Sequence, residues 1–207
     1  MSTLTPENLE SNGYVLHARL EHNDLVTFVR GYVFRKNPVM IFYWTFNVVI
    51  ILGALAGMFL SEFPIGLVTA RFFLGFAAFF PIIPIHEAIH GLGYKLAGAP
   101  TVQYKAIWRK LVFYAMADRF VTRSRPFFLL AIAPFIIINT ILCFLAFTLP
   151  DAWNWLAIGL LVMHTSGCSG DFALMSYFWE HRKEEPVTYD EVDNGVTWFY
   201  IRKGGAS

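Results

Sequence analysis

The stretch His86-Glu87-Ala88-Ile89-His90 ends a run of almost unbroken apolar residues that begins at Leu67. Two histidines four residues apart lie on one face of a helix, so both imidazoles can bind the same metal ion. A glutamate directly after the first histidine is typical of sites where a carboxylate acts as a base beside the metal. Residues 67–89 are long enough to cross a membrane, where unpaired polar side chains are unfavourable. The stretch therefore predicts a metal site inside a membrane helix.

The composition of the chain is that of a membrane protein. Of its 207 residues 56% are hydrophobic and only 15% are charged, against about 25% charged residues in soluble domains. The formal net charge is +1 and no dense basic tract is present, so we expect no nucleic-acid partner. Cys143 and Cys168 both fall within predicted spans, which argues against a structural disulfide. Residues 1–38 contain no apolar segment of the kind that signal peptides carry.

Four apolar segments predict an α-helical membrane protein with four transmembrane helices. The predicted spans are residues 39–60, 67–89, 127–149 and 152–179. Together they make a membrane domain of residues 39–179, preceded by an N-terminal segment of residues 1–38 and followed by a tail of residues 180–207. In the N-terminal segment, residues 25–33 have one apolar face, so this helix either lies in the membrane interface or packs against the rest of the protein.

Lysines and arginines predict the orientation of the spans. They gather in the two tails and in the loop of residues 95–126, while the two other loops together hold only Arg71. By the positive-inside rule, both termini and the long loop are expected to be cytoplasmic.

Small β elements are expected in two of these cytoplasmic segments. In the loop, residues 101–108 and 111–123 are rich in β-forming residues and are separated by Arg109-Lys110. They predict either a hairpin whose edge pairs with substrate or a loop at the interface. In the tail, Asn194-Gly195 separates two β-prone runs, which predicts a hairpin that residues 14–20 could extend as a third strand.

A third metal ligand is needed, because the histidine pair supplies only two and a catalytic zinc site has three protein ligands. His86 lies 19 residues after Leu67 and Asp171 lies 19 residues after Ala152. Since both spans run in the same direction, the two side chains are expected at the same depth, which favours Asp171.

Two further residues share a helical face with Asp171 and stay open as alternatives. His164 is either a ligand or a hydrogen-bond partner of one, and Cys168 is either a ligand or a buried packing residue. In residues 127–149, Asn139 is either a substrate or oxyanion contact or an interhelical hydrogen-bond partner. Pro81 and Pro84 are expected either to open the helix just ahead of His86 or only to bend it.

The motif in one span, followed by Ser169-Gly170-Asp171 in a later span, resembles a membrane family of zincin peptidases. More distantly it is similar to site-two proteases, which are zinc intramembrane metalloproteases. The resemblance covers about residues 67–180 and implies a three-helix metalloprotease-like core. It implies Zn²⁺ held by His86, His90 and Asp171, with Glu87 as the catalytic residue. In site-two proteases a glycine usually follows the ligand aspartate, whereas here Gly170 precedes Asp171.

The expected function is that of a zinc-dependent intramembrane metallopeptidase, which hydrolyses peptide bonds of membrane-protein substrates near the cytoplasmic face of the lipid bilayer. One alternative is a zinc hydrolase of a lipid amide or another membrane substrate, since the same activated water attacks any amide. Another is a non-enzymatic zinc-binding membrane protein. The presence of Glu87 argues against this last alternative, because retaining zinc does not require that carboxylate.

Overall fold

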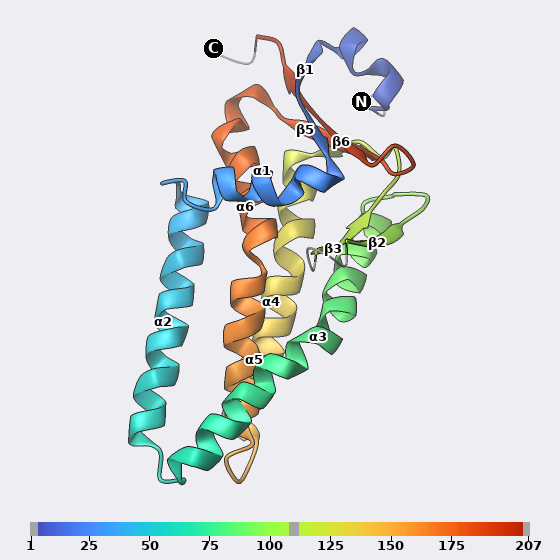
Figure 1. Ribbon diagram of the computed structural model, residues 1–207. Helices are drawn as coiled ribbons and strands as arrows, with labels where there is room; N and C mark the ends of the chain where they lie inside the picture. Colours follow the sequence, from blue (N-terminus) through green and yellow to red (C-terminus); the bar gives the residue numbers. More distant parts are fainter. Residues whose placement is uncertain (1–3, 108–111, 205–207) are drawn as a thin grey trace.

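The computed structural model describes residues 4–107 and 112–204, which form a helical bundle with a small β-sheet at one end, the sheet end (Figure 1). Within these described residues, three helices are long and apolar enough to cross a membrane. They are α2 (Pro38–Leu60), α3 (Ile65–Leu96) and α4 (Ser124–Thr148). Large apolar side chains on these helices are exposed, such as Val49 at 62% and Phe147 at 90%, as expected where lipid rather than water surrounds them. These helices mark a membrane protein.

Local sequence explains where the long helices begin and bend. Asn37 caps α2 by accepting a hydrogen bond from the Met40 N–H at 3.1 Å, and Pro38 occupies the first turn, where its missing N–H is not needed. The helix α3 contains Pro81 and Pro84 but stays helical through both, and it changes direction over its middle (Figure 1). The structure therefore has the bend and not the opening of the helix ahead of the metal stretch.

The expected fourth span is divided into two helices. They are α5 (Asn154–Gly167) and α6 (Ser169–Glu180), of 14 and 12 residues, which follow one another with a break at Cys168 (Figure 1). At 1.5 Å per residue each is only about 18–21 Å long, shorter than a membrane core of about 30 Å. The break falls in the polar, small-residue run of residues 166–170, where no bulky side chain holds the helix straight.

Helices α3 and α5 cross with their backbones in contact. A Cβ atom at Gly75 would overlap with the carbonyl oxygen of Leu156, and one at Gly159 would overlap with the carbonyl oxygen of Phe72. Small residues at a crossing allow membrane helices to pack this closely. The crossing therefore holds α3 and α5 at a fixed separation below the metal stretch.

The sheet at the sheet end has four antiparallel strands in the order β1-β6-β5-β4. Their bounds are Tyr14–Glu21 (β1), Val196–Arg202 (β6), Val187–Glu191 (β5) and Thr122–Arg123 (β4). The predicted tail hairpin is confirmed as β5 and β6, with Gly195 at a φ of 63° in its turn, and its predicted third strand is β1. The two-residue strand β4, just ahead of α4, lies within the predicted β-forming residues 111–123, but its pairing with β5 was not expected.

A separate two-stranded sheet confirms the β elements predicted in the middle loop. It pairs β2 (Gln103–Ile107) with β3 (Val112–Met116) in antiparallel register. The predicted turn at Arg109-Lys110 lies outside the described residues. Short 3₁₀ turns complete the chain at Pro6–Asn8, Glu10–Asn12, His22–Asp24 and Arg182–Glu184.

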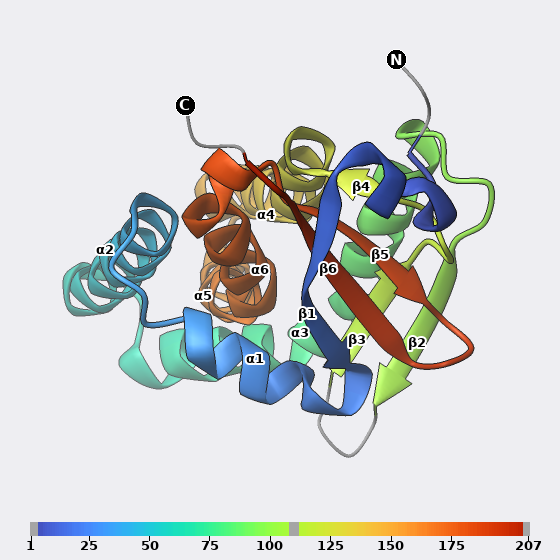
Figure 2. The ribbon, with the colours of Figure 1, turned by 90° about the horizontal axis from the view of Figure 1, so that it is seen from above.

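Aromatic packing joins the sheet to the bundle through helix α1 (Leu25–Tyr32). The ring of Phe28 stacks on Phe199 of β6 at a centroid distance of 5.5 Å, and Tyr177 of α6 lies 4.7 Å from Phe199. The apolar face of α1 thus packs against the protein, the second of the two arrangements considered. Viewed from the sheet end, the sheet lies on the α3 side of the bundle and α2 stands on the opposite side (Figure 2).

Candidate metal centre

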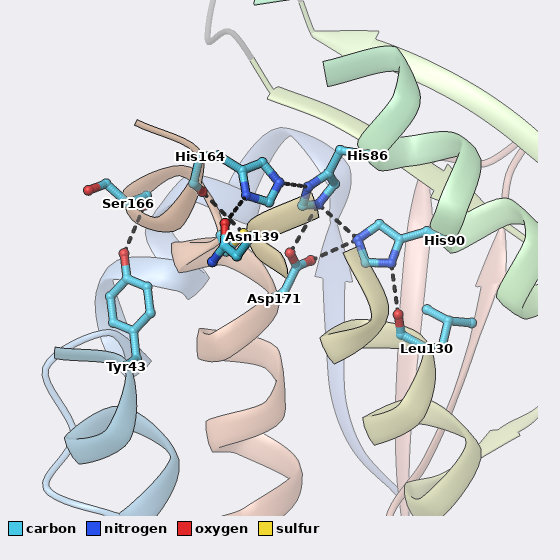
Figure 3. A network of polar contacts seen from close by, with 9 residues as sticks. Tyr43, His86, His90, Leu130, Asn139, His164, Ser166 and Asp171 are labelled. Atoms are coloured by element: carbon cyan, nitrogen blue, oxygen red, sulfur yellow. Dashed lines mark hydrogen bonds and ion pairs between the residues drawn. The ribbon is translucent and has the colours of Figure 1, made fainter. Parts of the chain in front are cut away.

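Two helices, α3 and α6, bring the three candidate ligands together (Figure 3). His86 and His90 lie on successive turns of α3, and Asp171 lies in the first turn of α6. Their ligand atoms fall within 4.8 Å of one another. The structure therefore brings together the three residues that the motif and the equal-depth argument selected, from positions 85 residues apart in the chain.

The distances between these ligand atoms match a zinc site. The two Nε2 atoms of His86 and His90 are 3.1 Å apart, and each lies 3.2 Å from a carboxylate oxygen of Asp171. Two ligands about 2.0–2.1 Å from zinc, at tetrahedral angles, are roughly 3.3 Å from each other. Two imidazole nitrogens and one carboxylate oxygen are also the donor types of catalytic zinc sites. The residues present fit the ion.

The far nitrogen of His90 is held by the backbone. Its Nδ1 lies 3.0 Å from the carbonyl oxygen of Leu130 in α4. A carbonyl oxygen can only accept a hydrogen bond, so the Nδ1 of His90 carries the proton and Nε2 keeps its lone pair for a metal. Since His90 is only 6% exposed, the ring has little freedom to turn.

The far nitrogen of His86 is held by side chains instead. Its Nδ1 lies 3.1 Å from Nε2 of His164, whose own Nδ1 lies 2.7 Å from Oδ1 of Asn139. Asn139 in turn donates from Nδ2 to Thr165 Oγ1 at 3.1 Å. The polar contacts thus continue from the metal centre into the interior of α4 and α5.

Glu87 lies beside the ligands with one oxygen free of any partner. Its Oε2 is buried and has no hydrogen-bond partner among the described residues, while the backbone of Ala115 in β3 hydrogen-bonds to the carboxylate. An unpartnered buried carboxylate oxygen is unfavourable unless a ligand or a water completes it. This oxygen is therefore available to accept a hydrogen bond or a proton from a water molecule bound next to the metal ligands.

The remaining predicted site residues lie near the centre but are engaged elsewhere. Cys168, His164 and His86 form a second group whose ligand atoms lie within 4.8 Å. However, both ring nitrogens of His164 already have partners, and the Cys168 thiol donates to the carbonyl oxygen of His164 at 3.2 Å. Asn139 is 4% exposed, and both ends of its amide are used inside the protein. The structure thus has the interhelical hydrogen-bond arrangement for Asn139, not a substrate or oxyanion contact.

Other residues at the centre were not selected from the sequence. The carbonyl of Leu130 and the backbone of Ala115 could not be, because every residue carries the same backbone groups. Tyr104 of β2 approaches α3 at Gly91, where a Cβ atom would overlap with its hydroxyl oxygen. A glycine directly after the second histidine was the only signal of that close approach.

A small cavity of about 90 Å³ lies on the sheet-end side of the metal centre. Its wall includes Ala115, the residue that contacts Glu87, and Tyr94, one turn beyond His90 on α3. At its other side Asp190 accepts a hydrogen bond from the Thr197 hydroxyl at 2.6 Å. Burial raises the pKa of the Asp190 carboxyl to about 6; the Thr197 hydrogen bond opposes this and the nearby charge of Asp118 adds to it.

A family model described as "Putative zincin peptidase" matches residues 79–185. The match contains the metal-binding half of α3, the β2–β3 sheet, and all of α4, α5 and α6. It therefore includes each of the three candidate ligands and Glu87. No curated protein and no solved structure matches the chain.

Proposed function

Because this chain belongs to the family described as putative zincin peptidases, which implies a zinc metallopeptidase acting on peptide bonds, we propose that it cleaves membrane-protein substrates at a site within the membrane. Zincin family membership implies Zn²⁺ as the cofactor. The intramembrane location and the class of substrate are the proposed parts. So is the likeness to site-two proteases, which rests on the two sequence motifs alone.

One observation carries the proposal. Glu87 Oε2 is buried and has no hydrogen-bond partner among the residues that the structure describes. Glu87 directly follows His86, in a helix that is long and apolar enough to cross a membrane. A protein that only stored or carried zinc would gain nothing from this free oxygen, since the three candidate ligands complete the donor set. A hydrolase needs such a carboxylate to move a proton.

In the proposed mechanism His86, His90 and Asp171 hold zinc, and Glu87 acts as the base. When bound, the ion supplies Lewis acidity, which lowers the pKa of a water molecule to about 7 and polarises the scissile carbonyl. Glu87 Oε2 takes the proton from the attacking water and later delivers it to the leaving amine. The backbone of Ala115 hydrogen-bonds to this carboxylate, which would leave Oε2 available for the proton.

The β2–β3 sheet is the proposed holder of the substrate. A substrate helix must be unwound before one of its peptide bonds can be attacked, and an unwound segment needs partners for its backbone groups. Strand β3 lies along α3, and its Ala115 contacts Glu87. An extended substrate that pairs with the edge of β3 would therefore pass next to the catalytic carboxylate.

The membrane arrangement is part of the same proposal. We take α5 and α6 together as a fourth crossing, whose break is held against α2 by a hydrogen bond from Ser166 to Asn47 at 2.9 Å. The domain limits are then residues 1–38, 39–179 and 180–207, with the sheet end in the cytoplasm. This placement follows the basic residues, because Arg71 is the only one in or next to the loops at the opposite end of the bundle.

The test is cleavage by purified protein in lipid vesicles that contain zinc and a set of single-span membrane proteins. We expect internal cleavage products from the unchanged chain. We expect their rate of formation to fall about 10²- to 10⁴-fold in Glu87→Gln, the range for loss of an acid–base group, while the zinc content is kept. Glu184→Gln is the matched control, because Glu184 is a surface carboxylate that pairs with His181 at 2.8 Å.

The result that would overturn the proposal is equal cleavage by Glu87→Gln and the unchanged chain, or no peptide product from any substrate. In the second case the vesicle lipids decide between the alternatives. Release of a fatty acid from a lipid amide, lost in Glu87→Gln, would assign the lipid hydrolase. Stoichiometric zinc with neither product would assign the non-enzymatic zinc-binding protein.

A further inference from the structure

A row of buried polar side chains connects the metal centre to α4. It begins with the contacts His86 to His164 and His164 to Asn139, at 3.1 and 2.7 Å (Figure 3). It ends with the contact Asn139 to Thr165 at 3.1 Å. His164 and Thr165 are 0% exposed and Asn139 is 4% exposed. Around them the helices are apolar, so each of these groups depends on its neighbour in the row for a hydrogen bond.

Such a row has a direction. A neutral imidazole has one N–H donor and one nitrogen acceptor, so a partner that fixes one nitrogen also fixes the other. Oδ1 of Asn139 can only accept, so Nδ1 of His164 carries a proton and its Nε2 accepts. Nδ1 of His86 must then donate. This leaves the lone pair of His86 on Nε2, the atom that faces His90 and Asp171.

The opposite direction would disable His86 as a ligand. If the Asn139 amide were turned by 180°, its NH₂ group would donate to Nδ1 of His164. His164 would then donate from Nε2 to His86, whose proton would move to Nε2. A nitrogen that carries a proton cannot bind a metal. In the structure the Asn139 NH₂ group donates to Thr165 Oγ1, and the amide oxygen faces His164.

We propose that Asn139 is a positioning residue which, through His164, holds His86 in the Nδ1–H tautomer that zinc binding requires. The proposal rests on the metal-binding role of His86 and goes beyond it, because it assigns the tautomer to a residue two contacts away. Asn139 does not touch the metal or the substrate. It acts only through the direction of the row.

The second histidine provides an internal reference. His90 donates to the carbonyl of Leu130, which has no alternative donor form. A change at Asn139 can therefore alter the tautomer of His86 and leave that of His90 as it is. A general disturbance of the bundle would affect both.

The first test removes the acceptor with Asn139→Leu, which nearly keeps the side-chain volume and suits an apolar site. In purified, zinc-free protein, ¹⁵N NMR of the imidazoles is expected to show the Nδ1–H form of His86 in the unchanged chain. In the variant it should show a large share of the Nε2–H form, with His90 unchanged. Zinc affinity, measured by competition with a chelator, should fall about 10- to 100-fold, as for other groups that support a ligand.

The second test asks whether Asn139 acts through His164. A glutamine at position 164 can offer His86 an amide oxygen. This oxygen accepts the hydrogen bond from Nδ1 of His86 without help from Asn139. We therefore expect His164→Gln to bind zinc more tightly than His164→Leu. The penalty of Asn139→Leu should nearly disappear when His164→Gln is already present, because the two sites would then be coupled in a double-mutant cycle. A penalty that persists in full would mean that Asn139 acts by packing, which overturns the proposal.

Asn47→Leu is the matched control. Asn47 is also a buried asparagine in a long helix, and its side chain hydrogen-bonds to Ser166 at 2.9 Å rather than to the row. The Asn47→Leu variant should be less stable than the unchanged chain but should show the same tautomer of His86. Equal effects of Asn47→Leu and Asn139→Leu on this tautomer would also overturn the proposal. None of these readouts needs a substrate, so a failure of peptide cleavage would count against the proposed function alone.

Discussion

At the scale of single residues, Asp171 makes the metal centre a three-ligand site. It approaches both histidines with its two carboxylate oxygens, at 3.2 Å each, and it lies on a helix that begins only two residues earlier. A carboxylate in the first turn is favoured by the helix dipole, which helps to hold this charge inside the bundle. Replacing Asp171 should therefore weaken zinc binding more than replacing a residue that only supports a ligand.

We expect Asp171→Ala to lose zinc more severely than His164→Ala. The first variant removes a ligand, whereas the second removes a hydrogen bond to His86, for which a loss of about 10- to 100-fold is typical. Metal content per chain after dialysis against a weak chelator measures the difference. Cys168→Ser is the control and should retain zinc. Retention by Asp171→Ala together with loss in Cys168→Ser would instead assign the thiol as the third ligand.

A second prediction at this scale concerns Asp190 in the cavity near Ala115. Its pKa in the folded protein is about 6, above the ordinary value of 3.8, so folding favours the protonated carboxyl. The stabilisation from this group is present in acid and is lost as the pH rises through about 6. Asp190→Asn removes the buried charge and keeps an oxygen for Thr197.

We therefore expect Asp190→Asn to raise the unfolding temperature at pH 8 by roughly 2–4 °C, which corresponds to about 1 kcal/mol for a chain of this size. At pH 3.5 the variant should have no advantage. Thermal scans at one fixed rate, followed by tryptophan fluorescence, measure both values. An equal effect of the substitution at the two pH values would contradict the assigned cause.

The sequence predicted the residues of the centre by type and spacing but not the atoms that hold them. His86, Glu87 and His90 follow from one motif, and Asp171 follows from counting residues along two parallel spans. The direction of the Asn139 amide and the carbonyl of Leu130 depend on how α4 packs, which no spacing within one helix reveals. Asn139 was considered as an interhelical partner, yet its link to His86 needs the positions of three helices.

At the scale of elements, the crossing of α3 and α5 decides whether His86 and His164 can meet. Gly75 and Gly159 allow the two backbones to touch, and the distance from each glycine to the centre is then set by helix geometry. In contrast, α2 lies farther from the centre and contributes no ligand. A substitution of a glycine at the α3–α5 crossing should therefore affect stability and zinc binding far more than a substitution of a glycine in α2.

Gly159→Leu is expected to destabilise the protein by about 3 kcal/mol, at the upper end for overpacking, because its Cβ would overlap with the backbone of Phe72. It should also weaken zinc binding by separating α5 from α3. Gly53→Leu is the matched control in α2, since a Cβ there meets nothing within 4 Å, and it should leave both quantities unchanged. Thermal unfolding and chelator competition measure them. Equal effects of the two variants would contradict a tight crossing.

Element boundaries were predictable where hydrophobicity and turn residues agree. Three apolar runs became α2, α3 and α4, and the Asn194-Gly195 turn became the β5–β6 hairpin. The division of residues 152–179 was not predicted; it falls in the polar, small-residue run of residues 166–170. A prediction from hydrophobic length alone counts these polar residues as part of one span, because it contains no information on how a helix packs.

At the scale of the whole molecule, the sheet end and the opposite end of the bundle differ in charge and in structure. The sheet and the first and last described residues lie at the sheet end, while a short turn after α2 and the α4–α5 connection form the other end (Figure 1). Most basic residues belong to the segments at the sheet end. The docking of β6 on α1 and α6 through aromatic rings was not predictable. It joins segments at the two extremes of the chain, which no local pattern relates.

The proposed orientation predicts which end is accessible from outside the cell. In a chain with Cys143 and Cys168 changed to serine, Glu62→Cys in the turn after α2 should react with a membrane-impermeant thiol reagent in intact cells. Lys203→Cys at the sheet end should react only after the membrane is opened. Both positions are exposed, so burial would not explain a failure to react. The reverse pattern would place the metal centre near the outer face.

The glycine crossing also limits how the length of this chain can change. From Gly75 to His86 there are 11 positions and from Gly159 to His164 there are five, and each added residue turns a helix by about 100°. A single insertion between Gly75 and His86 would turn both histidines by about 100° around α3, away from Asp171, without altering any residue of the centre. Insertions and deletions should therefore be excluded from these two intervals, even where substitutions are accepted, and be tolerated in the turn after α2.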